Sequence, residues 1–280
     1  MSPDDYCRER VAPRGSTLHY CLRKLPPGQR GAITALHALY REVDDAARHV
    51  TDPGVARVKL AWWRGEIAMA YEGSPSHPVA QALTAALPAH PLARAELEAI
   101  VDGVERNVEH RPFADFAALR AHCLSTGGTV GALSAGILGH RNPGTLDCVR
   151  ELGVALQLIG IIRDVGSDAR AGRIFLPVDE LERFGVAPAD ILARRAPPQF
   201  AALMQMQAAR ARDHCDRAIA GLPPGDRAAQ APCLAAAAIR RTLLDEIARD
   251  GFRVLDRRVA LTPVRKLLIA TRVLWTARSR

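Results

Sequence analysis

The chain has 280 residues, of which 48% are hydrophobic, 24% are charged and only 5% are aromatic. Its formal net charge of +8 favours an anionic partner, such as a diphosphate or a lipid surface. A membrane-spanning helix is excluded because no run of about eighteen apolar residues occurs. Nucleic acid is the weakest candidate partner, because the arginines are not interleaved with aromatic residues.

The first residues, MSPDDYCRERVAPRG, are charged and polar, so they do not form a secretory signal peptide. The six cysteines are scattered along the chain and include no CxxC pair. Such spacing is typical of reduced thiols in an intracellular protein. We therefore expect a cytoplasmic location.

Helical periodicity dominates the chain, and strand alternation bounded by hairpin turns is absent. The pattern predicts helices at 30–49, 55–71, 77–88, 93–110, 114–139 and 144–170. An extended segment at 173–177 and two further helices at 199–221 and 226–250 follow. Trp62 and Trp63 are expected to be packing residues. No stretch resembles a linker or a repeat, so we expect one all-α domain spanning 1–280.

The last segment, 263–280, combines an apolar and a basic side. Its apolar residues fall at 264, 267, 268, 274 and 275, and its basic residues are Arg265, Lys266, Arg272, Arg278 and Arg280. This pattern fits a helix lying at a membrane surface, which would give peripheral contact with the inner membrane. A terminal helix docked on the core would show the same pattern.

Two aspartates, Asp164 and Asp168, stand four residues apart in the segment QLIGIIRDVGSDARAGRIFLP. Carboxylates at this spacing lie one turn apart on the same helix face. Mg²⁺ is the natural counter-ion, because it prefers oxygen ligands and often bridges carboxylates to substrate phosphates. The alternative is an acidic turn neutralised by its own arginines at 163, 170 and 173.

A second acidic pair, Asp44 and Asp45, lies near the end of the first long helix, one turn after Arg41. Metal sites in helix bundles are commonly built from side chains on facing helices. Two acidic helices far apart in the sequence therefore suit a metal-diphosphate cavity. There, Mg²⁺ and arginines would stabilise the charge that develops on a departing diphosphate.

Four blocks of the chain carry a family resemblance. They are GSTLHYCLRKLPPGQRGAITALHALYREVDD, KLAWWRGEIAMAYEGSPSHPVAQAL, QLIGIIRDVGSDARAGRIFLP and RTLLDEIARDGFRVLDRRVALTPVRKL. In this order they resemble the squalene/phytoene synthase family, and within it the bacterial presqualene diphosphate synthases of hopanoid pathways. The resemblance implies an all-α isoprenoid synthase bundle around a central cavity. It also implies Mg²⁺-dependent, head-to-head condensation of two farnesyl diphosphates to presqualene diphosphate.

The resemblance also implies roles for single residues. It implies catalytic roles for Asp44, Asp45, Asp164 and Asp168, with Asp44, Asp164 and Asp168 as the Mg²⁺ ligands. The implied substrate contacts are Ser16, Arg41, Gln157, Arg163 and Arg173. Independently of the family, positions 157, 160, 164 and 168 advance by three, four and four residues and so share one helix face.

Several positions depart from the family pattern. Arg48 stands where the first motif should end in aspartate, Gly160 where asparagine is usual, and Asn107 where aspartate is expected. Leu18, His37, Leu124 and Arg240 stand where relatives often have aromatic residues.

Two of these departures have competing interpretations. Arg48 would weaken a metal site, or it would contact diphosphate in place of a metal. Gly160 would remove a ligand, or it would allow close helix packing. Two alternative functions follow from the departures: a related prenyl diphosphate cyclase, or a non-catalytic paralogue that binds partners.

Overall fold

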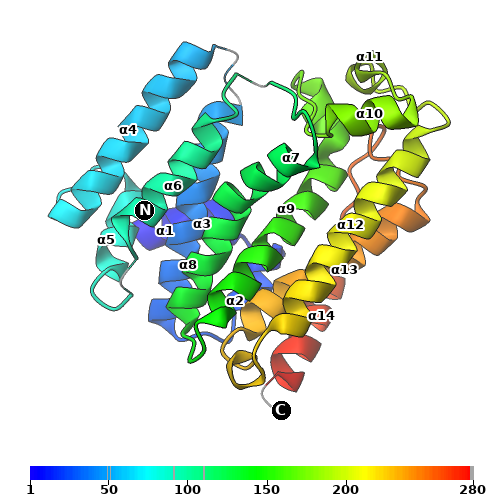
Figure 1. Ribbon diagram of the computed structural model, residues 1–280. Coiled ribbons are helices and arrows are strands. Elements are labelled where there is room, and N and C mark those ends of the chain that lie inside the picture. Colours follow the sequence, from blue (N-terminus) through cyan, green and yellow to red (C-terminus); the bar gives the residue numbers. More distant parts are fainter. Residues whose placement is uncertain (49, 51, 91, 110, 278–280) are drawn as a thin grey trace.

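The computed structural model describes residues 1–48, 50, 52–90, 92–109 and 111–277. Throughout this part of the chain the regular elements are helical and no strand occurs, so the predicted all-α class is confirmed. Figure 1 shows the long helices packed alongside one another, with α9 near the middle and α4 at one edge.

In chain order, one group of helical elements precedes α9, and a second group consists of α9 and the elements that follow it. Those before it are α1 (Pro3–Val11), α2 (Thr17–Leu22), α3 (Pro27–Arg48), α4 (Pro53–Glu72), α5 (Pro78–Ala86), α6 (Arg94–Glu105), α7 (Phe116–Cys123), the π-helical turn η1 (Leu124–Gly128) and α8 (Thr129–Leu138). The others are α9 (Gly144–Arg170), α10 (Val178–Phe184), α11 (Pro188–Leu192), α12 (Phe200–Gly221), the 3₁₀ turn η2 (Pro224–Asp226), α13 (Ala231–Arg249) and α14 (Pro263–Thr276).

The predicted helix at 114–139 is interrupted by the π-helical turn η1. There, the hydroxyls of Ser125 and Thr126 donate to the His122 carbonyl oxygen at 3.0 and 2.8 Å. Glycines at 127 and 128 follow and favour a helix weakly. Turns of this kind occur frequently at functional sites.

Other differences concern helix ends and short helices. The predicted helix at 226–250 begins only at 231, and Pro232 suits its first turn because proline lacks the N–H that would be unpaired there. The short helices α1, α2, α10 and α11 were not predicted. Ser2 caps α1 by accepting from the Asp5 N–H at 3.1 Å, so this start signal was present in the sequence. The helix predicted at 93–110 is too long, because α6 ends at Glu105 and residues 106–109 form a turn; the predicted end residues 49 and 110 themselves lie outside the described residues.

The hydrophobic core divides into two large clusters. One joins α9, α12, α13 and α14, and the other joins α1, α3, α4, α5, α6 and α8. Trp63 is buried in the second cluster as predicted, whereas Trp62 is 47% exposed on the surface of α4. None of the helices in the described residues is long and apolar enough to cross a membrane. All six cysteines lie in the described part of the chain and form no disulfide.

Glycines allow α9 to lie against its neighbours at very short range. A Cβ atom at Gly153 would come within 2.2 Å of the Gly127 carbonyl oxygen, and one at Gly166 within 2.3 Å of the Val254 carbonyl oxygen. A Cβ at Gly160 would meet no atom within 4 Å. The close-packing interpretation of Gly160 is therefore wrong: this glycine faces open space, and the tight contacts lie one to two turns away on either side.

Alanine at these positions should therefore have opposite effects on stability. Gly160→Ala is expected to raise the free energy of unfolding by up to about 1 kcal/mol, because alanine is the better helix former. Gly166→Ala is expected to lower it by about 1–3 kcal/mol, because the methyl group would overlap the backbone of residue 254. Urea denaturation of both variants measures the difference. Equal destabilisation by the two substitutions would contradict the packing described.

Candidate active site

A charged cavity of about 390 Å³ lies where α3 and α9 face each other. Its lining includes five arginines and three aspartates, which leaves a net charge of +2 when all the carboxylates are ionised. These charged residues are Arg41, Arg48, Arg163, Arg240, Arg258, Asp44, Asp164 and Asp168. The cavity therefore suits an anion that carries more than one negative charge.

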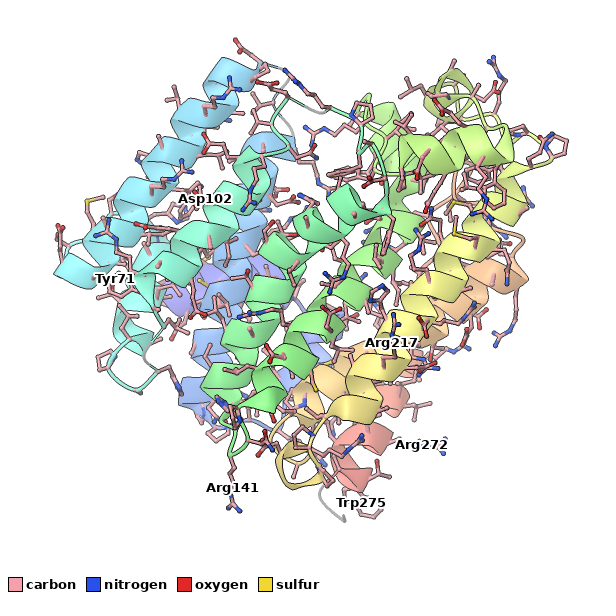
Figure 2. All side chains as sticks on the ribbon, viewed as in Figure 1. Tyr71, Asp102, Arg141, Arg217, Arg272 and Trp275 are labelled. Atoms are coloured by element: carbon pink, nitrogen blue, oxygen red, sulfur yellow. The ribbon has the colours of Figure 1, made fainter. Side chains whose placement is uncertain are left out.

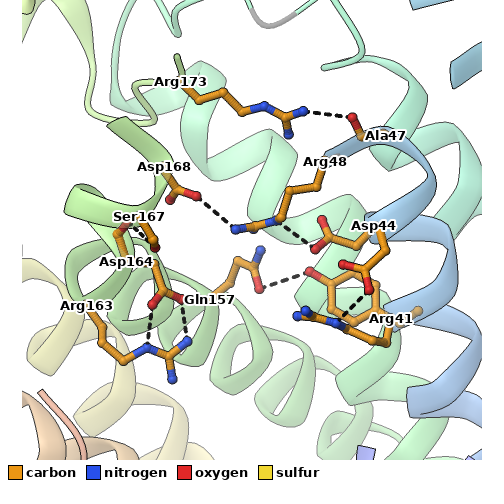
Figure 3. A network of polar contacts seen from close by, with 12 residues as sticks. Arg41, Asp44, Ala47, Arg48, Gln157, Arg163, Asp164, Ser167, Asp168 and Arg173 are labelled. Atoms are coloured by element: carbon orange, nitrogen blue, oxygen red, sulfur yellow. Dashed lines mark hydrogen bonds and ion pairs between the residues drawn. The ribbon is translucent and has the colours of Figure 1, made fainter. Parts of the chain in front are cut away.

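Two helices position most of these groups through regular spacing. On α3, Tyr40, Asp44 and Arg48 follow one another at intervals of four and all line the cavity. On α9, positions 157, 160, 164 and 168 also line it, so the predicted common face is confirmed. Figure 3 shows the two faces directed toward each other, with the Arg48 side chain between Asp44 and Asp168.

Arg48 connects the two aspartate motifs. Its Nε donates to Asp44 Oδ2 at 3.0 Å and its Nη1 donates to Asp168 Oδ1 at 2.8 Å. The guanidinium also lies 5.9 Å from the centre of the Phe175 ring. Burial opposes the charge of this group, but the carboxylates of Asp44 and Asp168 outweigh burial and raise the pKa of Arg48. The arginine thus occupies the position between the motifs where a metal was expected.

The other carboxylates of α9 have different environments. Arg163 Nε and Arg258 Nε each donate to Asp164 Oδ1 at 2.8 Å. Burial alone would raise the pKa of Asp164, but these two arginines outweigh it and lower the pKa to about 2. At Asp168 burial dominates over the charge of Arg48 and raises the pKa to about 6. Asp164 is therefore the more firmly ionised of the two.

Arg173 lies beside the cavity, not in its lining. Its Nη2 donates to the Ala47 carbonyl oxygen at 2.7 Å, in the last turn of α3. Carbonyls in the last turn of a helix lack intrahelical donors, so this bond caps α3. Burial lowers the pKa of Arg173. Arg173, which was predicted to contact diphosphate, therefore fixes the end of α3 in this structure.

Two more predicted site residues lie away from the charged cavity. Asp45 does not line the charged cavity, and Arg10 and Arg41 both donate to it, the latter at 3.1 Å. Ser16 caps α2 by accepting from the His19 N–H at 3.1 Å, and it lines a separate, apolar cavity.

This apolar cavity measures about 400 Å³ and lies between the two hydrophobic clusters. Its walls come from α1, α2, α3, η1, α8, α9 and α13. Five residues line both cavities: Tyr40, Arg41, Leu156, Gln157 and Arg240. At this junction the Tyr40 hydroxyl donates to Gln157 Oε1 at 3.3 Å. An apolar chamber thus opens onto a charged one.

Arg240 is the charged group most removed from water at the junction. Its Nη1 is buried and has no hydrogen-bond partner among the residues that the structure describes. Burial lowers the pKa of Arg240 to about 10. A buried donor without a partner is costly, so this group is set to receive an anion from the adjoining cavity.

The remaining departures from the family pattern divide between the cavities and other sites. Leu18 and His37 line the apolar cavity, and burial lowers the pKa of His37 to about 4. Leu124 begins η1 and packs against the first hydrophobic cluster. Asn107 lies in the turn after α6, outside both cavity linings.

Tyr40 and Arg258 line the charged cavity, and sequence reasoning singled out neither of them. Tyr40 carried a usable signal, because it precedes Asp44 by one helical turn. Arg258 carried none, because it follows α13 and reaches Asp164 only through the tertiary fold.

The residues present do not fit the expected Mg²⁺ between the two motifs. Each of the three proposed ligands is already paired with arginine, and the described residues contain no cluster of three or more metal-ligating side chains. At about 4 Å, a divalent cation would meet about 8 kcal/mol of repulsion from one guanidinium at an effective dielectric near 20. Between Asp44 and Asp168 the structure places the Arg48 guanidinium.

Comparison with known proteins identifies relatives over most of the chain. A sequence model described as squalene/phytoene synthase matches residues 11–265. Phytoene synthase 2 of Solanum lycopersicum is 30% identical, covering 94% of this chain and 87% of that protein. The phytoene synthase of Mycobacterium tuberculosis is 33% identical, covering 91% and 85%.

Solved structures agree on the fold. A dehydrosqualene synthase in complex with a ligand superposes with a TM-score of 0.85 at 24% identity, covering 99% of this chain and 97% of that one. Squalene synthase HpnC from Alicyclobacillus acidocaldarius superposes with a TM-score of 0.74 at 23% identity, covering 89% and 94%. The chain belongs to the squalene/phytoene synthase family.

Proposed function

We propose that the chain condenses two molecules of farnesyl diphosphate head to head to form presqualene diphosphate. Members of its family are prenyltransferases that join prenyl diphosphates head to head, and they are generally Mg²⁺-dependent. The observation that carries the proposal is the pair of joined cavities, one apolar and one rich in arginine. A prenyl diphosphate has the same two parts, so its tail suits the first chamber and its diphosphate the second.

The charged chamber would assist loss of the diphosphate. When the bond between C1 and the diphosphate oxygen breaks, negative charge grows on the leaving group. Arg41, Arg163 and Arg240 line the chamber and can donate hydrogen bonds to that charge. The apolar chamber would keep water from the allylic cation left behind. The double bond of the second substrate then attacks this C1 and leaves a cation on the second substrate. The same C1 loses one proton to the released diphosphate, and its electron pair closes the cyclopropane ring.

The relatives' names favour a second candidate, the phytoene-type condensation of two longer prenyl diphosphates. We prefer the shorter substrate because of the resemblance to presqualene diphosphate synthases, and because a cavity of about 400 Å³ lies at the small end of the range for ligand pockets, roughly 300–1,000 Å³.

Product analysis tests the proposal. Purified protein is incubated with farnesyl or geranylgeranyl diphosphate, with and without NADPH, and products are identified by mass spectrometry beside an Asp164→Ala control. Presqualene diphosphate from the wild type alone is the expected result. A cyclic terpene would favour the cyclase interpretation. No turnover of either substrate would favour a non-catalytic paralogue.

We also propose that α14 contacts an anionic membrane surface, from which a lipid substrate could be taken. Val264, Leu268 and Trp275 are spaced four and seven residues apart, share one face and are 65%, 65% and 73% exposed. Ala270 and Leu274 are buried and dock α14 on the core, as the second sequence interpretation expects, and the exposed face remains for the proposed membrane contact. Figure 2 shows Arg272 and Trp275 projecting outward.

The basic residues of this segment are not all available to a membrane. Arg265 pairs with Glu246 at 2.6 Å, and Lys266 Nζ donates to the Gly15 carbonyl oxygen at 3.1 Å. Arg278 and Arg280 lie outside the described residues. The membrane contact therefore rests on the exposed apolar face together with Arg272.

The double variant Val264→Ser, Leu268→Ser should bind phosphatidylglycerol vesicles about tenfold more weakly than the wild type, because two apolar side chains no longer enter the bilayer. Sedimentation with vesicles measures this partitioning. Val58→Ser is a matched control, since Val58 is 71% exposed on α4 at another face. Wild-type protein that stays in the supernatant, or equal loss in the control, would contradict the assignment to α14.

A further inference from the structure

We propose that Arg48 serves as a built-in cation that replaces a divalent metal between the two aspartate motifs and lets the site bind diphosphate without Mg²⁺. This inference rests on the proposed function, because it concerns the same cavity and the same chemical class of ligand. It departs from the metal dependence that is general in the family.

The first support is the position of the guanidinium. It is held by Asp44 on α3 and Asp168 on α9, at 3.0 and 2.8 Å, which are the two carboxylates that a bridging cation would share. The Phe175 ring lies on a further side at 5.9 Å. Contacts from two helices and an aromatic ring hold this side chain in one place, as a bound ion would be held by its ligands (Figure 3).

The second support is the number of donors that remain. A guanidinium carries five N–H donors in a fixed fork. Arg48 uses its Nε for Asp44 and one Nη1 donor for Asp168, and in the described part of the chain its Nη2 has no hydrogen-bond partner. Because the side chain also lines the charged cavity, the unused donors are available to a diphosphate oxygen.

The third support is the balance of charge and space in the cavity. Arg163 and Arg258 neutralise Asp164, the remaining candidate ligand. Gly160 leaves open space where the family usually presents an asparagine. The cavity thus lacks free carboxylates for a metal but keeps excess positive charge and room for an anion. Diphosphate itself would then complete the neutralisation that a metal completes elsewhere.

Titration calorimetry with inorganic pyrophosphate tests this inference without requiring turnover. The wild type is titrated in EDTA and again with Mg²⁺ in excess. We expect binding in EDTA within about threefold of the affinity with Mg²⁺. Binding that appears only with Mg²⁺ would overturn the inference, whatever the variants do.

Two variants locate the effect at Arg48. Arg48→Asp introduces the carboxylate that the family resemblance implies at this position and should bind pyrophosphate at least about tenfold more weakly in EDTA than with Mg²⁺. Arg94→Asp makes the same charge change on α6, where Arg94 pairs only locally with Glu98, and should behave as the wild type does. Thermal melting confirms that both variants are folded. Unchanged metal-free binding by folded Arg48→Asp would also overturn the inference.

The inference and the proposed function can fail separately. Pyrophosphate binding in EDTA without any prenyl product would leave the inference standing and remove the condensation activity. Presqualene diphosphate formation together with strictly Mg²⁺-dependent pyrophosphate binding would support the condensation activity and overturn the inference about Arg48.

Discussion

Replacement of Arg240 by leucine is expected to lower kcat/KM for farnesyl diphosphate by about 10²–10³, the usual cost of removing one preorganised donor to a developing anion. Arg240 lines both cavities, and its buried Nη1 has no partner among the described residues. The same substitution should raise the free energy of unfolding by about 1–3 kcal/mol, because an unsatisfied buried donor is removed.

The next residue provides a control for this prediction. Arg241 lies on the same helix but is directed to solvent, where it pairs with Asp216. Arg241→Leu should change neither kcat/KM nor folding by a large factor. Steady-state kinetics and urea denaturation of both variants measure the two effects. Full activity in Arg240→Leu, or reduced stability with a parallel loss of activity, would show that Arg240 is a structural residue.

Ser134→Phe is expected to lower kcat/KM for farnesyl diphosphate by about 10²–10³, because the larger side chain shortens the prenyl chain that the cavity admits. Ser134 is buried on α8 and lines the apolar cavity but not the charged one. Its hydroxyl bonds within its own helix, to the Val130 carbonyl oxygen at 2.7 Å. A phenyl ring there would exclude about one isoprene unit, whose five carbons each contribute about 0.8 kcal/mol on burial.

Geranyl diphosphate, which is one isoprene unit shorter, distinguishes this mechanism from general damage. The Ser134→Phe variant should accept geranyl diphosphate about as well as the wild type does, because the shortened cavity still holds ten carbons. Ser134→Ala removes only the hydroxyl and should keep the wild-type preference. Steady-state kinetics with both substrates measure the change. Equal loss with both substrates would contradict the assignment of this cavity to the prenyl tail.

The local features of the site could be predicted from the sequence because they depend on helical spacing. The face of α9 that carries Gln157, Asp164 and Asp168 follows from steps of three and four residues, and the structure places that face on the cavity. The acidic end of α3 also lies there, although only Asp44 of the pair faces the cavity. Periodicity could identify the helix but not its rotation against its neighbours.

The tertiary contacts could not be predicted in this way. Arg258 reaches Asp164 across 94 positions of sequence, and Arg48 reaches Asp168 across 120. Spacing along one helix carries no information about such pairs. Gly160 illustrates the same limit. The presence of glycine in the sequence does not show whether a neighbouring helix packs closely against it or whether it faces open space, and only the tertiary structure places it at the cavity.

Five of the seven departures from the family pattern line one or both cavities, and Asn107 and Leu124 do not. Arg48 joins two carboxylates, Arg240 stands at the junction, and Gly160 enlarges the charged chamber. Random loss of function would not be expected to leave each of these charges in a favourable place. Their positions are consistent with the proposed diphosphate site, in which Arg48 replaces a metal as a source of positive charge.

The ratio of diphosphate released to farnesyl diphosphate consumed tests the central claim most directly. Head-to-head condensation that stops at presqualene diphosphate releases one diphosphate for every two substrates. Hydrolysis, cyclisation or full conversion to a hydrocarbon releases one for each substrate. We predict the lower ratio, measured by coupled phosphate detection alongside mass spectrometry of the remaining prenyl diphosphates. A ratio of one to one, or no release at all, would contradict the proposed condensation.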